Sequence, residues 1–231
     1  MFPNQTIYLE IRSAAGGDEA ELWATDLLRM YMRFSARKNW KVTPVDSFTV
    51  KISGPQVFDL LKNEAGVHRV QRTPETEKRG RIHTSTATVA VVPLIAQGQV
   101  NINPNDLEIQ FFRSGGSGGQ NVNKVSTAVR LIHKPSGIVV SAQQERFQEK
   151  NREIALNLLR AKLSQRAQDE QKAKIQGFRT AIGTGDRSEK IKTYNYAQDR
   201  LTDHRIGKNF GNLEGIMDGN LDKVVEATKN L

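Results

Sequence analysis

The chain has 231 residues, of which 37% are hydrophobic and 26% are charged, and it contains no cysteine. This composition is typical of a protein with one or two cored domains, and it excludes disulfides, thiolate metal sites and cysteine nucleophiles. The 34 Lys and Arg residues outnumber the 25 Asp and Glu residues and give a net charge of +9. That excess indicates a partner that is a polyanion, with a merely soluble surface as the alternative.

Residue spacing disfavours two further classes of protein. The four histidines lack the i, i+3 or i+4 spacing of helical metal ligands, so we expect no metal ion and no other cofactor. The chain has no run of eighteen apolar residues and no charged-then-apolar leader. We therefore expect a protein of the cytoplasm, or of an equivalent compartment such as an organelle matrix, that does not bind a membrane.

Residues 1–100 are predicted to form an α+β domain. Apolar and polar residues alternate at 7–12, as in a half-buried strand, and a Gly-Gly turn follows. From Asp18 the apolar residues recur at helical spacing, and acidic residues fill the first turn, where the helix dipole favours them. Two more strands are predicted at residues 47–52 and 84–92, with a short helix between them.

Residues 101–180 are predicted to form a second α+β domain. It has a strand near Ile109, a glycine-rich loop at 115–119 and then a hairpin. The hairpin strands are expected at residues 129–132 and 138–141. From about residue 145 the chain reads as one long helix, whose polar tail at 165–174 is expected to lie in solvent.

Residues 181–231 form a third segment, which we expect to pack with the first domain. Basic residues are interleaved here with two tyrosines, Tyr194 and Tyr196, and this combination suits RNA. Tyrosines packed beneath a solvated charged face are an equally good explanation. The chain closes with an amphipathic helix that is interrupted at Gly219 and Asn220. The basic residues of the segment are Arg187, Lys190, Lys192, Arg200 and Arg205.

The most unusual stretch is Ser-Gly-Gly-Ser-Gly-Gly-Gln at residues 114–120. It is not a phosphate-binding P-loop, because Gly119 is followed by Gln120 rather than by Lys and a hydroxyl residue. A flexible linker fits the glycines but leaves Gln120 unexplained. A loop whose backbone amides enter a crowded site and stabilise an oxyanion also fits. No nucleophile with a nearby base is evident, so hydrolysis here would depend on positioned water and on a partner.

Three motifs together resemble a known family. The segment from Arg113 to Asn123 resembles the GGQ segment of bacterial and organellar class I peptide chain release factors. The resemblance continues in Gly-Thr-Gly-Asp-Arg-Ser at 183–188 and in Thr-Asp-His-Arg at 202–205, in the family's order. It implies an α+β fold, in which a codon-reading unit is combined with the C-terminal segment and a GGQ domain carries a long helix.

The resemblance implies translation termination, with a stop codon of the mRNA, peptidyl-tRNA, both ribosomal subunits and ribosomal RNA as partners. Gly118 and Gly119 would permit the loop's conformation, and the backbone N–H of Gln120 would stabilise the transition state of ester hydrolysis. The Gln120 side chain would shape the water site, and the 2′-OH of the tRNA would take part. This glutamine is often methylated in the family, which implies a glutamine methyltransferase as a further partner.

Stop-codon preference follows from a tripeptide. Pro74-Glu75-Thr76 matches the Pro-x-Thr sequence of family members that read UAA and UAG. The alternative is structural, because Gly16 and Glu19 suit a turn and a helix cap, and Thr and His are common at strand ends. By resemblance, Gly16 and Glu19 would read the first uridine, and Thr76 would read the second base. His83 would stack between the second and third bases, and Gln71 and Thr84 would contact the third. Pro74 and Ile82 complete the predicted codon-binding set.

Two departures and two rival functions complete the interpretation. Familiar full-length members begin with a helical domain that this chain lacks, which bears on cooperation with the GTPase release factor. The loop between Val42 and Ser53 is short, and Glu75 places a carboxylate beside RNA, so reduced codon affinity is expected. The rivals are a codon-independent ribosome-rescue hydrolase and a noncatalytic ribosomal RNA-binding protein. The Pro-x-Thr tripeptide and His83 argue against the first, and the complete Gly-Gly-Gln sequence argues against the second.

Overall fold

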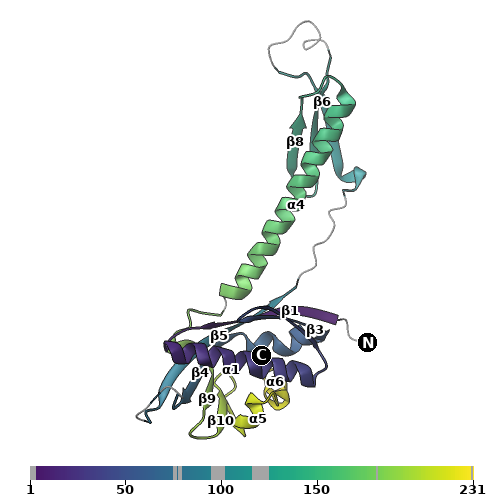
Figure 1. Cartoon of the computed structure of the whole chain (residues 1–231). Coiled ribbons are helices and arrows are strands. Elements are labelled where there is room, and N and C mark those ends of the chain that lie inside the picture. The colour runs from purple at the N-terminus through teal and green to yellow at the C-terminus, as the bar shows by residue number, and fades with distance from the viewer. Residues whose placement is uncertain are drawn as a thin grey trace. The chain divides into compact units, whose positions relative to one another are not determined.

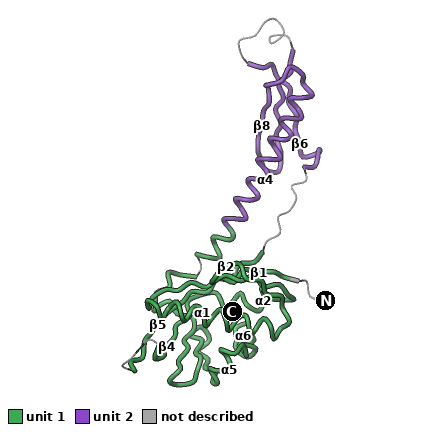
Figure 2. Tube along the Cα trace, viewed as in Figure 1, with its two compact units in different colours: residues 1–95, 174–231 green, residues 96–173 purple. Residues whose placement is uncertain are grey.

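The computed structural model describes residues 4–74, 77, 80–94, 102–115, 125–180, 182–229 and 231. It divides into two compact units, residues 1–95 with 174–231 (unit 1) and residues 96–173 (unit 2), which are green and purple in Figure 2. Both units contain strands and helices, so the predicted α+β class is confirmed. Within the ranges just given, no helix is long and apolar enough to span a bilayer.

Unit 1 is built on a sheet whose eight described strands run in the order β11-β10-β9-β4-β5-β1-β3-β2 (Figure 1). Neighbouring strands are antiparallel, except that β4 and β9 are parallel. The strands are β1 (Asn4–Ser13), β2 (Lys41–Asp46), β3 (Thr49–Pro55), β4 (Gly66–Arg72), β5 (His83–Pro93), β9 (Lys190–Asn195), β10 (Arg200–Asp203) and β11 (Lys208–Gly211).

Helix α1 (Asp18–Arg37) supplies the main apolar face of the unit 1 core. Its apolar residues recur every three or four positions, so Trp23, Leu27 and Met30 fall on one buried stripe. The indole Nε1 of Trp23 donates a hydrogen bond of 3.0 Å to the carbonyl oxygen of His68, which ties the helix to β4. The helix predicted from Asp18 is therefore confirmed, as is the strand before it.

Three shorter helices complete this core, namely α2 (Val57–Leu61), α5 (Leu213–Met217) and α6 (Asp222–Thr228). Unit 1 also contains the single turns η1 (Lys62–Glu64) and η3 (Arg187–Glu189). The break between α5 and α6 occurs where the chain approaches α1. Gly219 has a φ of +91°, and a Cβ there would lie 2.6 Å from the backbone nitrogen of Phe34. The predicted interruption at Gly219 is confirmed, and its cause is this close approach.

The C-terminal segment enters the sheet through β9. The pairing of β9 with β4 places Lys192 beside His68 and Asn195 beside Gln71. Sequence reasoning missed β2, β4 and the three C-terminal strands, because polar and charged residues interrupt the alternation on which strand prediction depends. The segment is thus part of the same sheet as β4 rather than an appended element.

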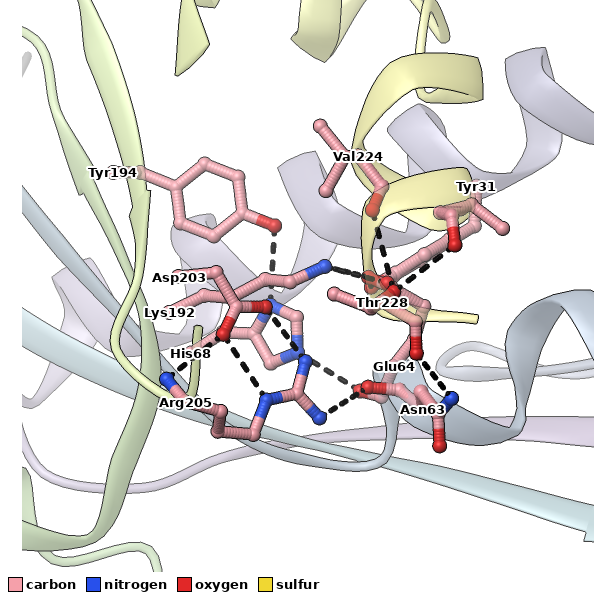
Figure 3. A network of polar contacts seen from close by, with 11 residues as sticks. Tyr31, Asn63, Glu64, His68, Lys192, Tyr194, Asp203, Arg205, Val224 and Thr228 are labelled. Atoms are coloured by element: carbon pink, nitrogen blue, oxygen red, sulfur yellow. Dashed lines mark hydrogen bonds and ion pairs between the residues drawn. The ribbon is translucent and has the colours of Figure 1, made fainter. Parts of the chain in front are cut away.

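A buried polar network lies where β4 and β9 meet η1 (Figure 3). The Nζ of Lys192 contacts the two carboxylate oxygens of Glu64 at 2.5 and 2.6 Å, and both side chains are fully buried. Tyr31 donates to Glu64 at 2.9 Å, and the hydroxyl of Tyr194 lies 3.1 Å from Nδ1 of His68. The prediction that Lys192 belongs to an exposed basic surface is wrong, because its charge is paired in the core.

Charges in this network are balanced by neighbouring groups. Burial alone would raise the pKa of Glu64, but the Lys192 ammonium lowers it below its ordinary value. Burial and the same ammonium lower the pKa of His68 to about 4, so this ring is neutral at pH 7. Arg205 donates to Asp203 at 2.7 Å and to the carbonyl oxygen of Asn63 at 2.6 Å, which joins β10 to η1.

Unit 2 pairs a three-stranded antiparallel sheet of order β6-β7-β8 with helix α4 (Gln148–Thr180), which continues into unit 1 from residue 174. Val129 and Leu131 of β7 pack against Ala155 and Leu159 of α4. The predicted hairpin and long helix are confirmed, although the helix begins at Gln148 rather than near residue 145. Its tail at 165–174 is mostly exposed, as expected. The strands are β6 (Leu107–Phe112), β7 (Ala128–His133) and β8 (Ile138–Ala142), and η2 (Pro104–Asp106) precedes them.

Candidate RNA-binding site

A hollow of about 350 Å³ in unit 1, here called the reading hollow, collects residues from three remote segments. The segments are the turn before α1, the chain at the start of β5, and η3. Four residues singled out from sequence lie together in it, whereas Arg81 and Arg187 had not been assigned to a site. Arg187 lies inside the Gly-Thr-Gly-Asp-Arg-Ser motif at 183–188, and Arg81 directly precedes the predicted residues Ile82 and His83. The lining residues are Gly16, Arg81, Ile82, His83, Thr84, Ser85 and Arg187.

The turn before α1 is fastened to β5 by the backbone. Ala14 N–H donates to the carbonyl oxygen of Thr86 at 2.9 Å, and Thr86 N–H donates to that of Ala15 at 2.8 Å. The Thr86 hydroxyl donates to the carbonyl oxygen of Gly185 at 3.0 Å, which brings in the Gly-Thr-Gly-Asp motif. At Gly16, φ is +142° and a Cβ would lie 2.4 Å from Oγ of Ser85, so only glycine fits.

Glu19 is not available to the hollow through its side chain. The residue is 4% exposed, and one carboxylate oxygen accepts from Nε of Arg72 at 2.7 Å. Its other oxygen is buried and has no hydrogen-bond partner among the described residues. Burial alone would lower the pKa of Arg72, but hydrogen bonds to Glu19 and Asp26 raise it above its ordinary value. What α1 offers at this end is its first-turn backbone N–H groups, since the N-cap residue Gly17 gives no side-chain cap.

His83 is held by a carboxylate. Its Nε2 lies 2.7 Å from Oε2 of Glu77, whose side chain is only 6% exposed and also accepts from Arg81 at 3.3 Å. The His83 side chain itself is 42% exposed, and Ile82 beside it is 60% exposed. An aromatic ring and an apolar side chain are therefore presented at the surface of a basic hollow, which suits base stacking.

A row of polar side chains crosses three strands next to the hollow. Gln71 of β4 is paired with Thr84 of β5 on one side and with Asn195 of β9 on the other. Directly paired residues of adjacent strands share a face of the sheet, so Asn195, Gln71 and Thr84 form a polar row. Of the remaining predicted residues, Pro74 is buried, and Thr76 lies outside the described residues, as does Glu75.

The glycine loop is described only at its two ends. Gly118, Gly119 and Gln120 lie outside the described residues, so their predicted roles stay predictions. Phe112 of β6 pairs with Ala128 of β7, which holds the two ends of the intervening loop at one end of the sheet. Phe147, with 64% of its surface exposed, lines a hollow of about 520 Å³ beside these loop ends.

The two tyrosines of the C-terminal segment divide between the explanations given for them, which were RNA binding and packing beneath a charged face. Tyr194 is fully buried and stacks on His68, as the structural alternative required. Tyr196 is 39% exposed, and the guanidinium of Arg72 lies 5.4 Å from its ring centroid, so an aromatic surface remains at this edge.

Two family models match the sequence. The model described as the RF-1 domain matches residues 96–205, and the model described as the PCRF domain matches residues 2–89. Peptide chain release factor 1 of Lactobacillus helveticus is 48% identical over 235 residues, with 97% of this chain and 65% of the relative covered. The protein of that name from Caldicellulosiruptor saccharolyticus is 51% identical over 234 residues, with 96% and 66% covered.

A solved structure agrees with these matches. RF2 of Thermus thermophilus aligns with a TM-score of 0.56 and 34% identity, covering 100% of this chain and 69% of that one. This chain spans just under two thirds of the length of the two curated relatives named above. Sequence identity of this size over nearly all of its residues, together with the two family models, confirms the resemblance: the chain belongs to the peptide chain release factor family.

Proposed function

We propose that this chain terminates translation: it reads UAA and UAG in the ribosomal A site and triggers hydrolysis of the peptidyl-tRNA ester. The observation that carries the proposal is the reading hollow, where Gly16, His83 and Thr84 lie together on a basic background. His83 and Thr84 are consecutive, whereas Gly16 is remote in sequence, so it is the fold that brings Gly16 to them. The likeness to proteins named Peptide chain release factor 1 supports the same function.

The first base is read by the backbone. Because the Glu19 carboxylate is buried against Arg72, its side chain cannot meet RNA without breaking that ion pair. Ala20 N–H donates to the carbonyl oxygen of Gly17 at 2.9 Å, so the donors proposed at the start of α1 are the N–H groups of Asp18 and Glu19, and the carbonyl oxygens of uracil are acceptors. The turn at Gly16, which has a φ of +142° and no room for a Cβ beside Ser85, fixes the backbone that leads into these donors.

The second and third bases fall to β5 and β4. His83 presents a ring that can stack between two unstacked bases, as single-stranded RNA recognition requires. Thr84 and Gln71 stand side by side on paired strands and offer a hydroxyl and an amide to the third base. Recognition of the second base by Thr76 is proposed from the Pro-x-Thr tripeptide alone.

Hydrolysis is proposed for Gly118, Gly119 and Gln120 on the strength of the family motif. Backbone N–H groups of such a loop stabilise the oxyanion that forms when water attacks the ester. The pairing of Phe112 with Ala128 supports this role, because a loop held at both ends places its tip with less loss of conformational freedom. The proposed partners are both ribosomal subunits with their RNA, the stop codon, peptidyl-tRNA and a methyltransferase acting on Gln120.

Peptide release from defined ribosomal complexes tests the proposal. Complexes carrying UAA, UAG, UGA, a sense codon or an empty A site are mixed with the chain, and released peptide is counted over time. Release confined to UAA and UAG is the expected result. Release on the empty A site would instead show a rescue hydrolase, and no release with retained binding would show a noncatalytic RNA-binding protein.

A matched pair of variants separates catalysis from binding. Gln120→Ala keeps the backbone N–H and removes only the side chain that would shape the water site, so the rate of release at saturating protein should fall while binding to UAA complexes is retained. Gln165→Ala, a change of the same kind on the exposed tail of α4, should alter neither quantity. Equal loss of binding and release in Gln120→Ala contradicts catalysis by the loop.

A further inference from the structure

Within the polar row, Gln71 is held by contacts from both neighbouring strands. Asn195 and Gln71 are directly paired on β9 and β4, and Nδ2 of Asn195 donates to Oε1 of Gln71 at 3.3 Å. Tyr196 N–H donates to the carbonyl oxygen of Gln71 at 3.0 Å, so the backbones are locked at this position. Thr84 stands on the other side of Gln71 and lines the reading hollow.

The orientation of the Asn195 amide is fixed by a backbone group. The N–H of Gln198 donates to Oδ1 of Asn195 at 3.1 Å, and a backbone N–H can only donate. This contact identifies the Asn195 oxygen and leaves its Nδ2 as a donor. Nδ2 also donates to Oε1 of Gln198 at 3.2 Å, which holds the amide plane from a second side. Since Nδ2 can only donate, the Gln71 atom that faces it must be the oxygen.

The geometry points to Asn195 as a specificity-determining residue for the third codon position, an inference that rests on the proposed function. By engaging Oε1 of Gln71, Asn195 leaves the Gln71 NH₂ group as the donor for the base. Adenine and guanine share an N7 acceptor, guanine adds the O6 acceptor, and adenine instead carries an N6 donor. An amide held as a donor can therefore donate to N7 of either purine, and it can also donate to O6 of guanine. Asn195 thus supports reading of UAG beside UAA.

The test is Asn195→Asp, which changes hydrogen-bond sense with almost no change of shape. One carboxylate oxygen can still accept from Gln198 N–H, so the local turn is kept. The other oxygen can only accept, so the Gln71 amide must rotate its NH₂ toward it and turn Oε1 to the base. An acceptor there is unfavourable at N7 of both purines and at O6 of guanine, but it can accept from the N6 donor of adenine. We expect kcat/KM for release at UAG to fall about tenfold relative to UAA.

Two controls make the ratio of the two codons decisive. The added negative charge weakens binding to both codons alike, and Asn209→Asp on the exposed strand β11 measures that effect with no change in the ratio. In a Gln71→Ala background, Asn195→Asp should leave the ratio unchanged, because the amide through which it acts is absent. A ratio shift that persists without Gln71, or an unchanged ratio in Asn195→Asp alone, overturns the inference.

Failure of this inference is distinguishable from failure of the proposed function. If the unaltered chain releases peptide only at UAA and UAG while Asn195→Asp keeps their ratio, only the role of Asn195 is lost. If the unaltered chain releases peptide on an empty A site, codon reading and the role of Asn195 fall together. Thermal unfolding of Asn195→Asp within a few degrees of the unaltered chain confirms that the ratio reports on recognition.

Discussion

Replacing Lys192 with Met leaves the Glu64 carboxylate buried without its cation. Both side chains have no exposed surface, and their contacts of 2.5 and 2.6 Å are direct. Removing one partner of such a buried pair costs about 3–5 kcal/mol, because the remaining charge is uncompensated. For a chain of this size, about 4 kcal/mol lowers the melting temperature by about 8–16 °C. The cost should fall on unit 1, where the pair lies.

Tryptophan fluorescence during urea unfolding measures this cost for unit 1 alone. The chain has two tryptophans, Trp23 and Trp40, and both lie in the core of unit 1. Arg33→Met is the matched control: it also replaces a cation of an ion pair, but its side chain and that of Asp218 are 47% and 62% exposed. Such a surface pair contributes about 0–1 kcal/mol.

The dependence on pH gives the same prediction a second test. In the unaltered chain the pKa of Glu64 is lowered, so its stabilising contribution is present above its ordinary value and is lost as the pH falls through the lowered one. Without Lys192, burial raises the Glu64 pKa, so its protonation removes the penalty as the pH falls from 7 toward 4. Without the Lys192 ammonium, the pKa of His68 is lowered less, so the variant loses less stability than the unaltered chain as the pH falls. This effect also makes the stability difference between the two proteins smaller at low pH.

Three results would refute this reasoning. Lys192→Met could destabilise no more than Arg33→Met, its penalty could stay constant down to pH 4, or the double change Lys192→Met with Glu64→Gln could fail to recover most of the lost stability. Each outcome would show that Lys192 and Glu64 do not form a buried ion pair whose two charges depend on each other.

Further predictions concern His68 and two glycines. Because the folded-state pKa of His68 is about 4 against an ordinary 6.5, stability should fall by about 3 kcal/mol between those pH values, and urea unfolding should show a smaller loss for His68→Gln. Gly16→Ala should raise the protein concentration needed for half-maximal release, because the new Cβ would clash with Ser85. Gly17→Ala should raise that concentration less, because nothing lies within 4 Å of a Cβ there. Equal effects of the two changes would exclude the predicted clash. Gly219→Ala should cost unit 1 about 1–3 kcal/mol by tryptophan fluorescence, and an unchanged midpoint would contradict the close approach to α1.

Strong periodicity was enough to predict several elements correctly. The alternation at 7–12, the apolar stripe that contains Trp23 and the hairpin of unit 2 all agree with β1, α1, β7 and β8. The strands that were missed carry polar side chains that satisfy each other. In β9, Lys192 looks like a surface residue until Glu64, which is remote in sequence, supplies its partner. Local pattern does not encode such a long-range pairing.

Some residues of the candidate site could be predicted from sequence, and others depend on tertiary packing. Residues inside family motifs, such as Gly16, His83 and Thr84, were found from sequence, and the structure brings these three into one hollow. The side-chain state of Glu19 was not predictable, since its ion pair with Arg72 depends on how α1 packs on β4. Asn195 was missed because an amide in a basic segment has no distinctive sequence signal, and only the pairing of β9 with β4 places it beside Gln71.

The parallel pairing of β4 with β9 also sets the order in which this protein can become competent during its own synthesis. Glu64 and Lys192 are 128 positions apart, so the sheet that carries Gln71 cannot be completed until all of unit 2 has been translated. A nascent or prematurely ended chain that stops before η3 lacks both Arg187 and Asn195, and so it lacks one lining residue of the reading hollow and one member of the polar row. Because Gly118, Gly119 and Gln120 are translated before β9, no nascent chain can have the complete sheet without also having the glycine loop.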